Sequence, residues 1–195
     1  MSLFSNPFRN KPLIFARMEQ FKIIPPSAAL SPYIRHYWML VSDDVGQAQR
    51  LIPTGCVELV FHRGHPLMRG GAAIPRVSVC GQTSAFSDLI PGGTVDMIAV
   101  VFRPFGAGAF FGMSVSELSG LTVGAEDLGI RMLKELEEQI LYAADDEQCI
   151  RLIESFLLGR LQPFKPWNYD RMAAAVALIN SSGGEISVSS LAGKV

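Results

Sequence analysis

The chain has 195 residues, of which 49% are hydrophobic and 18% are charged, and its formal net charge at pH 7 is −1. This length suits one sizeable domain with an appendage, and the apolar composition favours a self-associating surface. The near-neutral charge shows no excess of basic residues of the kind that binds DNA, so an inferred role with nucleic acid has to rest on sequence motifs.

The first 32 residues are rich in proline, phenylalanine, asparagine and serine. Pro25-Pro26 and Ser31-Pro32 prevent long helices there, because proline lacks a backbone N–H and restricts the residue before it. We therefore expect residues 1–32 to form an N-terminal arm that lies over the domain that follows.

Residues 33 to about 105 carry strand signals. Four short runs are rich in β-branched or aromatic residues: Tyr33 to Val41, Val57 to His62, Val77 to Gly81 and Val95 to Phe102. They are separated by turn-forming residues such as Pro91-Gly92-Gly93. Several short strands at this spacing predict an antiparallel barrel or sandwich.

Beyond residue 106 the apolar residues follow a helical period. Leu133, Leu136, Ile140 and Ala143 form one stripe, and Ile150, Ile153, Leu157 and Leu161 form a second. Asp145-Asp146 between them favours a helix N-terminus, so the pattern predicts a helical hairpin over about 127–161. Ile150, Ile153 and Leu157 are candidates for an isologous dimer surface, with sealing of the barrel as the alternative.

Prolines at 163 and 166 indicate a linker over 162–169, and a further helix is expected after it. Four apolar residues of this helix fall on one stripe: Met172, Ala175, Val176 and Ile179. Asp170 is its expected N-cap and Gly183-Gly184 its expected stop. Ser187 then reads as the N-cap of a second helix, with Leu191 and Ala192 as its first inward-facing pair.

This C-terminal pattern carries a resemblance to a known family. A helix headed by Asp170-Arg171, closing on Ser182-Gly183-Gly184 and followed by Ile186 to Ala192, resembles the opening of the AraC-type DNA-binding domain. That family has two successive helix-turn-helix units. The resemblance implies that residues 170–195 are the truncated start of such a domain, and that the recognition helix, which enters the major groove, would lie beyond Val195.

A second resemblance covers residues 33–161. Three segments, Tyr33 to Trp38, Ile52 to Phe61 and Ile98 to Phe111, are similar in sequence and order to the N-terminal domains of some AraC-like regulators. The resemblance implies an α+β protein with a cupin-like antiparallel β-barrel, then the helical hairpin and the truncated helix-turn-helix domain. It also implies a small-molecule effector, a homodimer, and binding to DNA by the full-length protein but not specifically by this chain.

Three residues are candidates for effector binding: Trp38, Glu58 and Arg103. Trp38 has a large amphipathic ring, Glu58 is an acid inside an apolar strand, and Arg103 is a guanidinium at the end of another strand. If Glu58 and Arg103 face each other in the protein interior, they form a structural ion pair or the polar groups of a ligand site.

The same region contains side chains of the types that bind metal ions. The possible ligands are His36, His62, His65, Cys56, Glu58 and Cys80, and an extended strand would place Glu58 and His62 on one face. The usual cupin pattern of two histidines separated by one residue is missing, however, and no nucleophile or dinucleotide motif is present. We expect no metal, no cofactor and no catalysis; the alternative is a stand-alone cupin-like binding protein or enzyme.

The remaining features concern location. Cys56, Cys80 and Cys149 are odd in number and have no C-x-x-C spacing, which fits a reducing cytosol. The longest apolar run, Met97 to Phe102, is far shorter than the ~20 residues that span a bilayer. We therefore expect a cytoplasmic protein without membrane contact.

Overall fold

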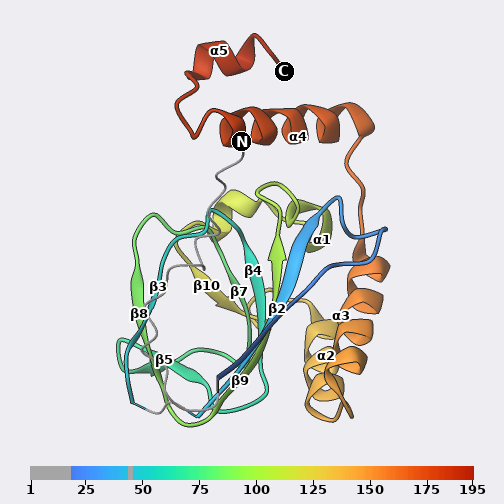
Figure 1. Cartoon of the computed structure of the whole chain (residues 1–195). Helices are drawn as coiled ribbons and strands as arrows, with labels where there is room; N and C mark the ends of the chain where they lie inside the picture. Colours follow the sequence, from blue (N-terminus) through green and yellow to red (C-terminus); the bar gives the residue numbers. More distant parts are fainter. Residues whose placement is uncertain (1–18, 44–45) are drawn as a thin grey trace.

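The computed structural model describes residues 19–43 and 46–195 (Figure 1). Within them, ten β-strands form two antiparallel sheets, accompanied by five α-helices and one short 3-10 helix. The predicted α+β class is therefore confirmed. A search of the same residues for a helix long and apolar enough to cross a bilayer finds none.

The larger sheet has six strands. In spatial order they are β1 (Glu19–Ile24), β2 (Ile34–Ser42), β9 (Val95–Phe102), β4 (Glu58–His62), β7 (Val77–Cys80) and β10 (Thr122–Gly124). The smaller sheet contains β3 (Gln49–Leu51), β8 (Ser87–Pro91), β5 (Leu67–Arg69) and β6 (Ala72–Ala73). No strand pairing joins the two sheets in the described part of the chain, so a closed barrel is not found.

The large sheet is covered on both faces. One face packs against the helices α1 (Gly108–Phe111), α2 (Arg131–Leu141) and α3 (Asp146–Arg160), through side chains such as Leu59 and Ile98. The other face packs against the small sheet. Because β4 and β9 are central and covered on both sides, their sequences are nearly continuous apolar runs.

The predicted hairpin is present as α2 and α3. Asp145 is the N-cap of α3, where its Oδ1 accepts a hydrogen bond of 2.7 Å from the backbone N–H of Gln148. The proposed dimer surface on α3 is wrong, because Ile153 and Leu157 are fully buried in the core of a single chain and Ile150 packs against the same core. The stripe covers the sheet, as the alternative interpretation expected.

The region predicted as an arm includes a strand. Residues 1–18, which form most of that prediction, lie outside the described residues. Glu19–Ile24 form β1, which pairs with β2 in antiparallel register, with Ile23 opposite Trp38. Within the predicted arm, Glu19–Ile24 are therefore a strand of the large sheet, and residues 25–32 are loop and turn.

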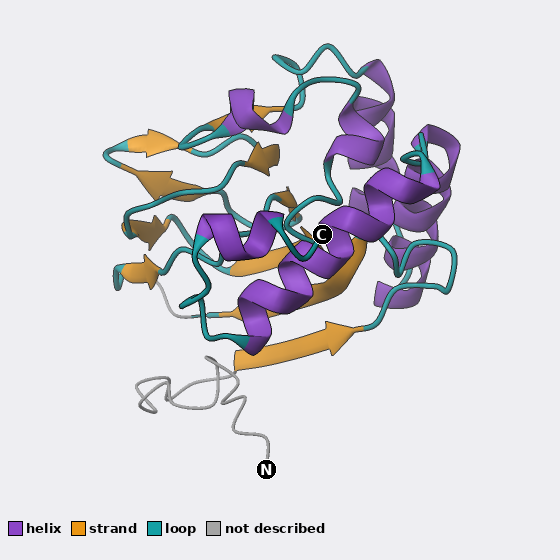
Figure 2. Cartoon of the chain, turned by 90° about the horizontal axis from the view of Figure 1, so that it is seen from above, coloured by secondary structure: helices purple, strands orange, loops and turns teal. Residues whose placement is uncertain are grey.

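The C-terminal helices lie across one end of the two-sheet body (Figures 1 and 2). Helix α4 (Pro166–Ser181) begins inside the predicted linker, so Asp170 is not its N-cap. Proline suits this start because the first N–H of a helix has no partner within it. The glycine stop is confirmed, with positive φ at Gly183 and Gly184. Ser187 caps α5 (Val188–Ala192), as predicted, with its Oγ 3.1 Å from the N–H of Ser190.

Candidate functional site

A row of polar side chains crosses the large sheet on the face that turns toward the small sheet. Residues paired directly across antiparallel strands point to the same face. The row runs over five adjacent strands through His36, Val101, Glu58, Cys80 and Thr122. Arg69, from the small sheet, donates a hydrogen bond of 2.8 Å from Nη1 to Oγ1 of Thr122, which lies 3.8 Å from the Cys80 sulfur. A carboxyl, a thiol, a hydroxyl and a guanidinium are thus gathered between the sheets.

Glu58 is the central acid of this row. Burial raises the pKa of Glu58 to about 7, and the nearby Thr54 hydroxyl only partly opposes the shift. Burial also raises the pKa of the Cys80 thiol and lowers that of His36, which Arg35 lowers further. Burial therefore favours the uncharged form of each of these three groups, and a neutral carboxyl, thiol or imidazole can donate hydrogen bonds.

His62 lies on the same face of β4 as Glu58, two positions beyond Val60. Burial lowers the pKa of His62 to about 4, with a further contribution from Arg76, and its Nδ1 has no hydrogen-bond partner. The Ser78 hydroxyl on the neighbouring strand is also buried without such a partner. A search of the described residues finds no group of three or more histidine, cysteine or acidic side chains that could hold a metal ion.

Trp38, on β2, lies in the same space between the two sheets. It is opposite Ala99, half-buried, and packs against the cluster between the sheets. Its ring centroid is 6.1 Å from that of Phe21 on β1. Trp38 and Glu58, two of the three predicted effector residues, are therefore placed on one face of the sheet, in adjacent cross-strand rows.

Arg103, the third predicted residue, belongs to a different place. It follows β9 directly, is exposed, and donates a hydrogen bond of 2.9 Å from Nε to the carbonyl of Ser31. It forms no ion pair with Glu58 and is not among the groups that shift the pKa of Glu58. The condition that Glu58 and Arg103 face each other in the interior is therefore not met, because the exposed guanidinium lies on the Ser31 carbonyl after the strand ends.

Arg103 instead lines a cavity of about 180 Å³ between the turn after β9 and helix α4. The side chains that give the cavity its character are Arg103, Phe105, Tyr169, Ala173, Val176 and Asn180. A second, more open hollow of about 320 Å³ lies beside Met172 and Val195. Both hollows border α4, which has no buried side chain among those described.

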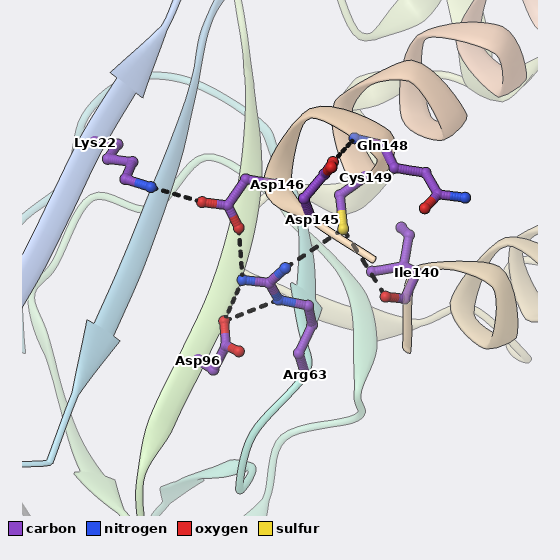
Figure 3. A network of polar contacts seen from close by, with 8 residues as sticks. All are labelled: Lys22, Arg63, Asp96, Ile140, Asp145, Asp146, Gln148 and Cys149. Carbon is purple, nitrogen blue, oxygen red and sulfur yellow. Dashed lines mark hydrogen bonds and ion pairs between the residues drawn. The ribbon is translucent and has the colours of Figure 1, made fainter. Parts of the chain in front are cut away.

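The opposite face of the large sheet carries a network of charged side chains (Figure 3). Arg63, in the turn after β4, contacts Oδ1 of Asp96 at 2.7 Å and Oδ1 of Asp146 at 3.2 Å through Nη2. Its Nη1 lies 3.4 Å from the sulfur of Cys149, and Lys22 holds the other oxygen of Asp146 at 2.8 Å. The network joins β1, β9 and the start of α3.

Sequence reasoning missed several members of these sites. The alternation within Val77–Cys80 could have placed Ser78 and Cys80 on one face. Nothing local in the sequence indicates that Arg69 reaches Thr122, or that Tyr169 and Asn180 share a cavity with Arg103, because these contacts depend on the arrangement of distant elements.

Comparison with protein families gives one match. Residues 22–124 match a family described as a domain of unknown function (DUF6597). The matched range runs from within β1 to the end of β10 and so includes both sheets and the polar row. No curated protein and no solved structure matches the chain significantly.

Proposed function

The chain belongs to the DUF6597 family, and we propose that it is the effector-sensing and dimerising portion of an AraC-like transcriptional regulator. The domain of this family is known in AraC-like regulators. In this proposal the two-sheet body is a cupin-like sensor in the cytoplasm, without catalytic activity. Helices α4 and α5 are the start of a double helix-turn-helix domain that binds promoter DNA in the full-length protein.

The observation that carries the proposal is the uncovered helix pair at the C-terminal end. None of the described side chains of α4 or α5 is buried, although both helices carry apolar residues. Ile179 is 39% exposed and Val188 is 84% exposed, whereas Leu191 is only half-buried. Short helices gain most of their stability from packing an apolar face. These uncovered faces support packing against further DNA-binding helices.

The polar row between the sheets supports the sensing part. Glu58, Cys80 and Thr122 offer half-buried donors and acceptors beside an apolar wall that includes Trp38. Such a combination of apolar lining and a few convergent polar groups is typical of small-molecule sites. An effector can regulate only if it binds one arrangement of the protein more tightly than another.

The same row favours a second candidate function, a stand-alone cupin-like protein that binds or converts a small molecule. A single experiment separates the two. The given chain and a version extended by two helix-turn-helix units are each incubated with a pool of random DNA duplexes, and the bound duplexes are sequenced. We expect the extended form to select a sequence motif and the given chain to select none.

A matched pair of substitutions in the extended form tests the role of α5. Leu191→Asp places a charge on the face expected to pack inward, and should abolish the selected motif. Ser189→Asp places the same charge on an exposed position of the same helix and should preserve it. Absence of any sequence preference by the extended form, at every salt concentration tested, would remove the main support for the proposal.

Dimerisation is a separate part of the proposal. Because Ile153 and Leu157 are core residues, the large apolar side chains that the described hairpin still exposes are Met132, Leu141, Tyr142 and Leu158. We expect sedimentation velocity to give a dimer at micromolar concentration. A monomer throughout the accessible concentration range would contradict this part while leaving DNA recognition to be judged by the selection experiment.

A further inference from the structure

Helix α4 is attached to the body mainly through aromatic rings near its N-terminal end. The rings of Phe164 and Tyr169 lie 6.0 and 5.9 Å from that of Tyr33, and Tyr169 makes an edge contact of 5.6 Å with Phe105. Beyond Tyr169, the helix is separated from the turn after β9 by the cavity that Arg103 lines. The cavity thus lies where the direction of α4 is set.

The cavity wall that faces α4 is the turn after β9, and backbone hydrogen bonds hold this turn in place. The backbone N–H of Arg103 donates to the carbonyl of Tyr33 at 2.8 Å, and the N–H of Gly106 donates to the carbonyl of Arg103 at 2.8 Å. A side chain at Gly106 would collide with the Tyr33 carbonyl, so this turn requires glycine at position 106. The guanidinium of Arg103 is therefore presented from a fixed backbone, which lowers the ordering cost of binding.

The lining combines a cation with aromatic and apolar surface. No acidic side chain lines the cavity with Arg103 among the described residues; its Nε donates to the Ser31 carbonyl, which leaves its terminal nitrogens to meet an anion. The rings of Phe105 and Tyr169 meet at 83° and form a corner, and Ala173 and Val176 supply an apolar side. Arginine matches a carboxylate with two parallel hydrogen bonds, and rings favour edge or offset contact with other rings.

The size of the cavity limits the ligand further. Its 180 Å³ is below the roughly 300–1,000 Å³ of sites for drug-sized ligands. A single substituted ring is therefore the appropriate scale. We propose that this cavity binds a small aromatic carboxylate, with the carboxylate on Arg103 and the ring between Phe105, Tyr169 and the alanine-rich side of α4.

Such a ligand would contact the body and α4 together, and so would favour the arrangement in which α4 is held against the turn. Its influence on DNA binding rests on the proposed function, whereas binding to the cavity does not. This site is distinct from the polar row, because Arg103 and Glu58 do not pair and the cavity lining includes no residue of that row.

The test uses benzoate as the probe and isothermal titration calorimetry of the chain as it exists, with benzamide as an uncharged analogue of nearly the same shape. We expect saturable binding of benzoate with a Kd of about 1 mM or tighter, and at least about tenfold weaker binding of benzamide. Arg103→Gln should weaken benzoate binding roughly tenfold or more, because a charge-assisted contact is lost. Arg131→Gln, at a side chain that is 93% exposed, should not change it.

A second pair of variants tests the cavity itself. Ala173→Leu fills the space beside Tyr169 and should weaken benzoate binding about tenfold or more, while Ala174→Leu adds the same bulk at a neighbouring exposed position outside the lining and should preserve it. Thermal unfolding of all four variants verifies that they fold. The assignment is overturned if benzoate does not bind, if benzamide binds equally well, or if Arg103→Gln or Ala173→Leu binds like the wild type. DNA selection by the extended chain needs no benzoate, so it fails or succeeds independently of this result.

Discussion

Arg63 reaches from the turn after β4 to the first turn of α3, where its Nη2 lies 3.2 Å from Oδ1 of Asp146. The side chain of Arg63 is only 16% exposed, and the same guanidinium also binds Asp96 on β9. Asp146 in turn accepts a hydrogen bond from Lys22 of β1 (Figure 3). The position of α3 on the sheet is thus fixed by polar contacts as well as by its apolar face.

The first prediction concerns this arginine. Arg63→Met should lower the free energy of unfolding by about 1–3 kcal/mol, because Asp96 and Asp146 lose their shared, largely buried partner. The side chains of Asp96 and Asp146 are each 32% exposed, so the expected loss of unfolding free energy is at the lower end of the range for broken buried ion pairs. Urea unfolding measures the change. Lys22→Met is the control, since an ion pair with a 55% exposed lysine should contribute no more than about 1 kcal/mol. Equal losses in the two variants would contradict the assigned role of Arg63.

The second prediction concerns Glu58 and pH. Burial raises the pKa of Glu58 from 4.5 to about 7, so between these values the folded chain holds a proton that the unfolded chain has released. Stability should therefore fall as pH rises through this range and level off above it. Glu58→Gln removes this dependence. Urea unfolding gives the free energy of unfolding of each protein at each pH. We expect the variant's value minus the wild type's value to rise by at most about 3 kcal/mol between about pH 4 and pH 8. A pH-independent difference would show that Glu58 is not desolvated.

The third prediction tests the position of α3. Ile153 is fully buried in the core, whereas Leu158 on the same helix is 45% exposed. Ile153→Ala should cost about 2–5 kcal/mol of unfolding free energy, because it removes buried methyl groups and leaves a cavity. Leu158→Ala should cost much less. If dilution to the monomer made Ile153→Ala as stable as the wild type, the residue would belong to a dimer interface after all.

The fourth prediction concerns the wall of the Arg103 cavity. Gly106→Ala introduces a Cβ against the Tyr33 carbonyl and should destabilise the chain by about 1–3 kcal/mol or more. Gly159→Ala, in α3, meets no atom within 4 Å and should stabilise the chain by about 0.5–1 kcal/mol through helix propensity. Differential scanning calorimetry compares the two. A tolerated alanine at 106 would mean that the turn is not fixed.

The strongest strands were predictable because they are central. The predicted run from Val95 to Phe102 is β9 in full, and Val57 to His62 differs from β4 by one residue. Both strands are buried on two faces, which requires a long apolar run. Strands β3 and β8 were missed because they lie in the smaller sheet and carry exposed polar side chains such as Arg50 and Asp88, so neither is a continuous apolar run.

The candidate site was predictable only in part. Glu58 and Trp38 could be found because each is unusual in its own strand. The neighbours of Glu58 depend on register, which places Cys80 on one side and Val101 on the other. Register is set by turns and by both faces of the sheet together, so no single segment contains it. The start of α4 was misplaced for a simpler reason: proline breaks helix interiors but is well suited to the first helical position.

His62 and Arg63 are neighbours in the chain and serve opposite sides of the large sheet. The imidazole is buried on the same face as Glu58, whereas the guanidinium binds Asp146 and, through it, Lys22. A local twist at the end of β4 would displace both side chains at once, in opposite directions. The packing between the two sheets and the polar contact that holds α3 therefore both depend on the backbone at the end of β4.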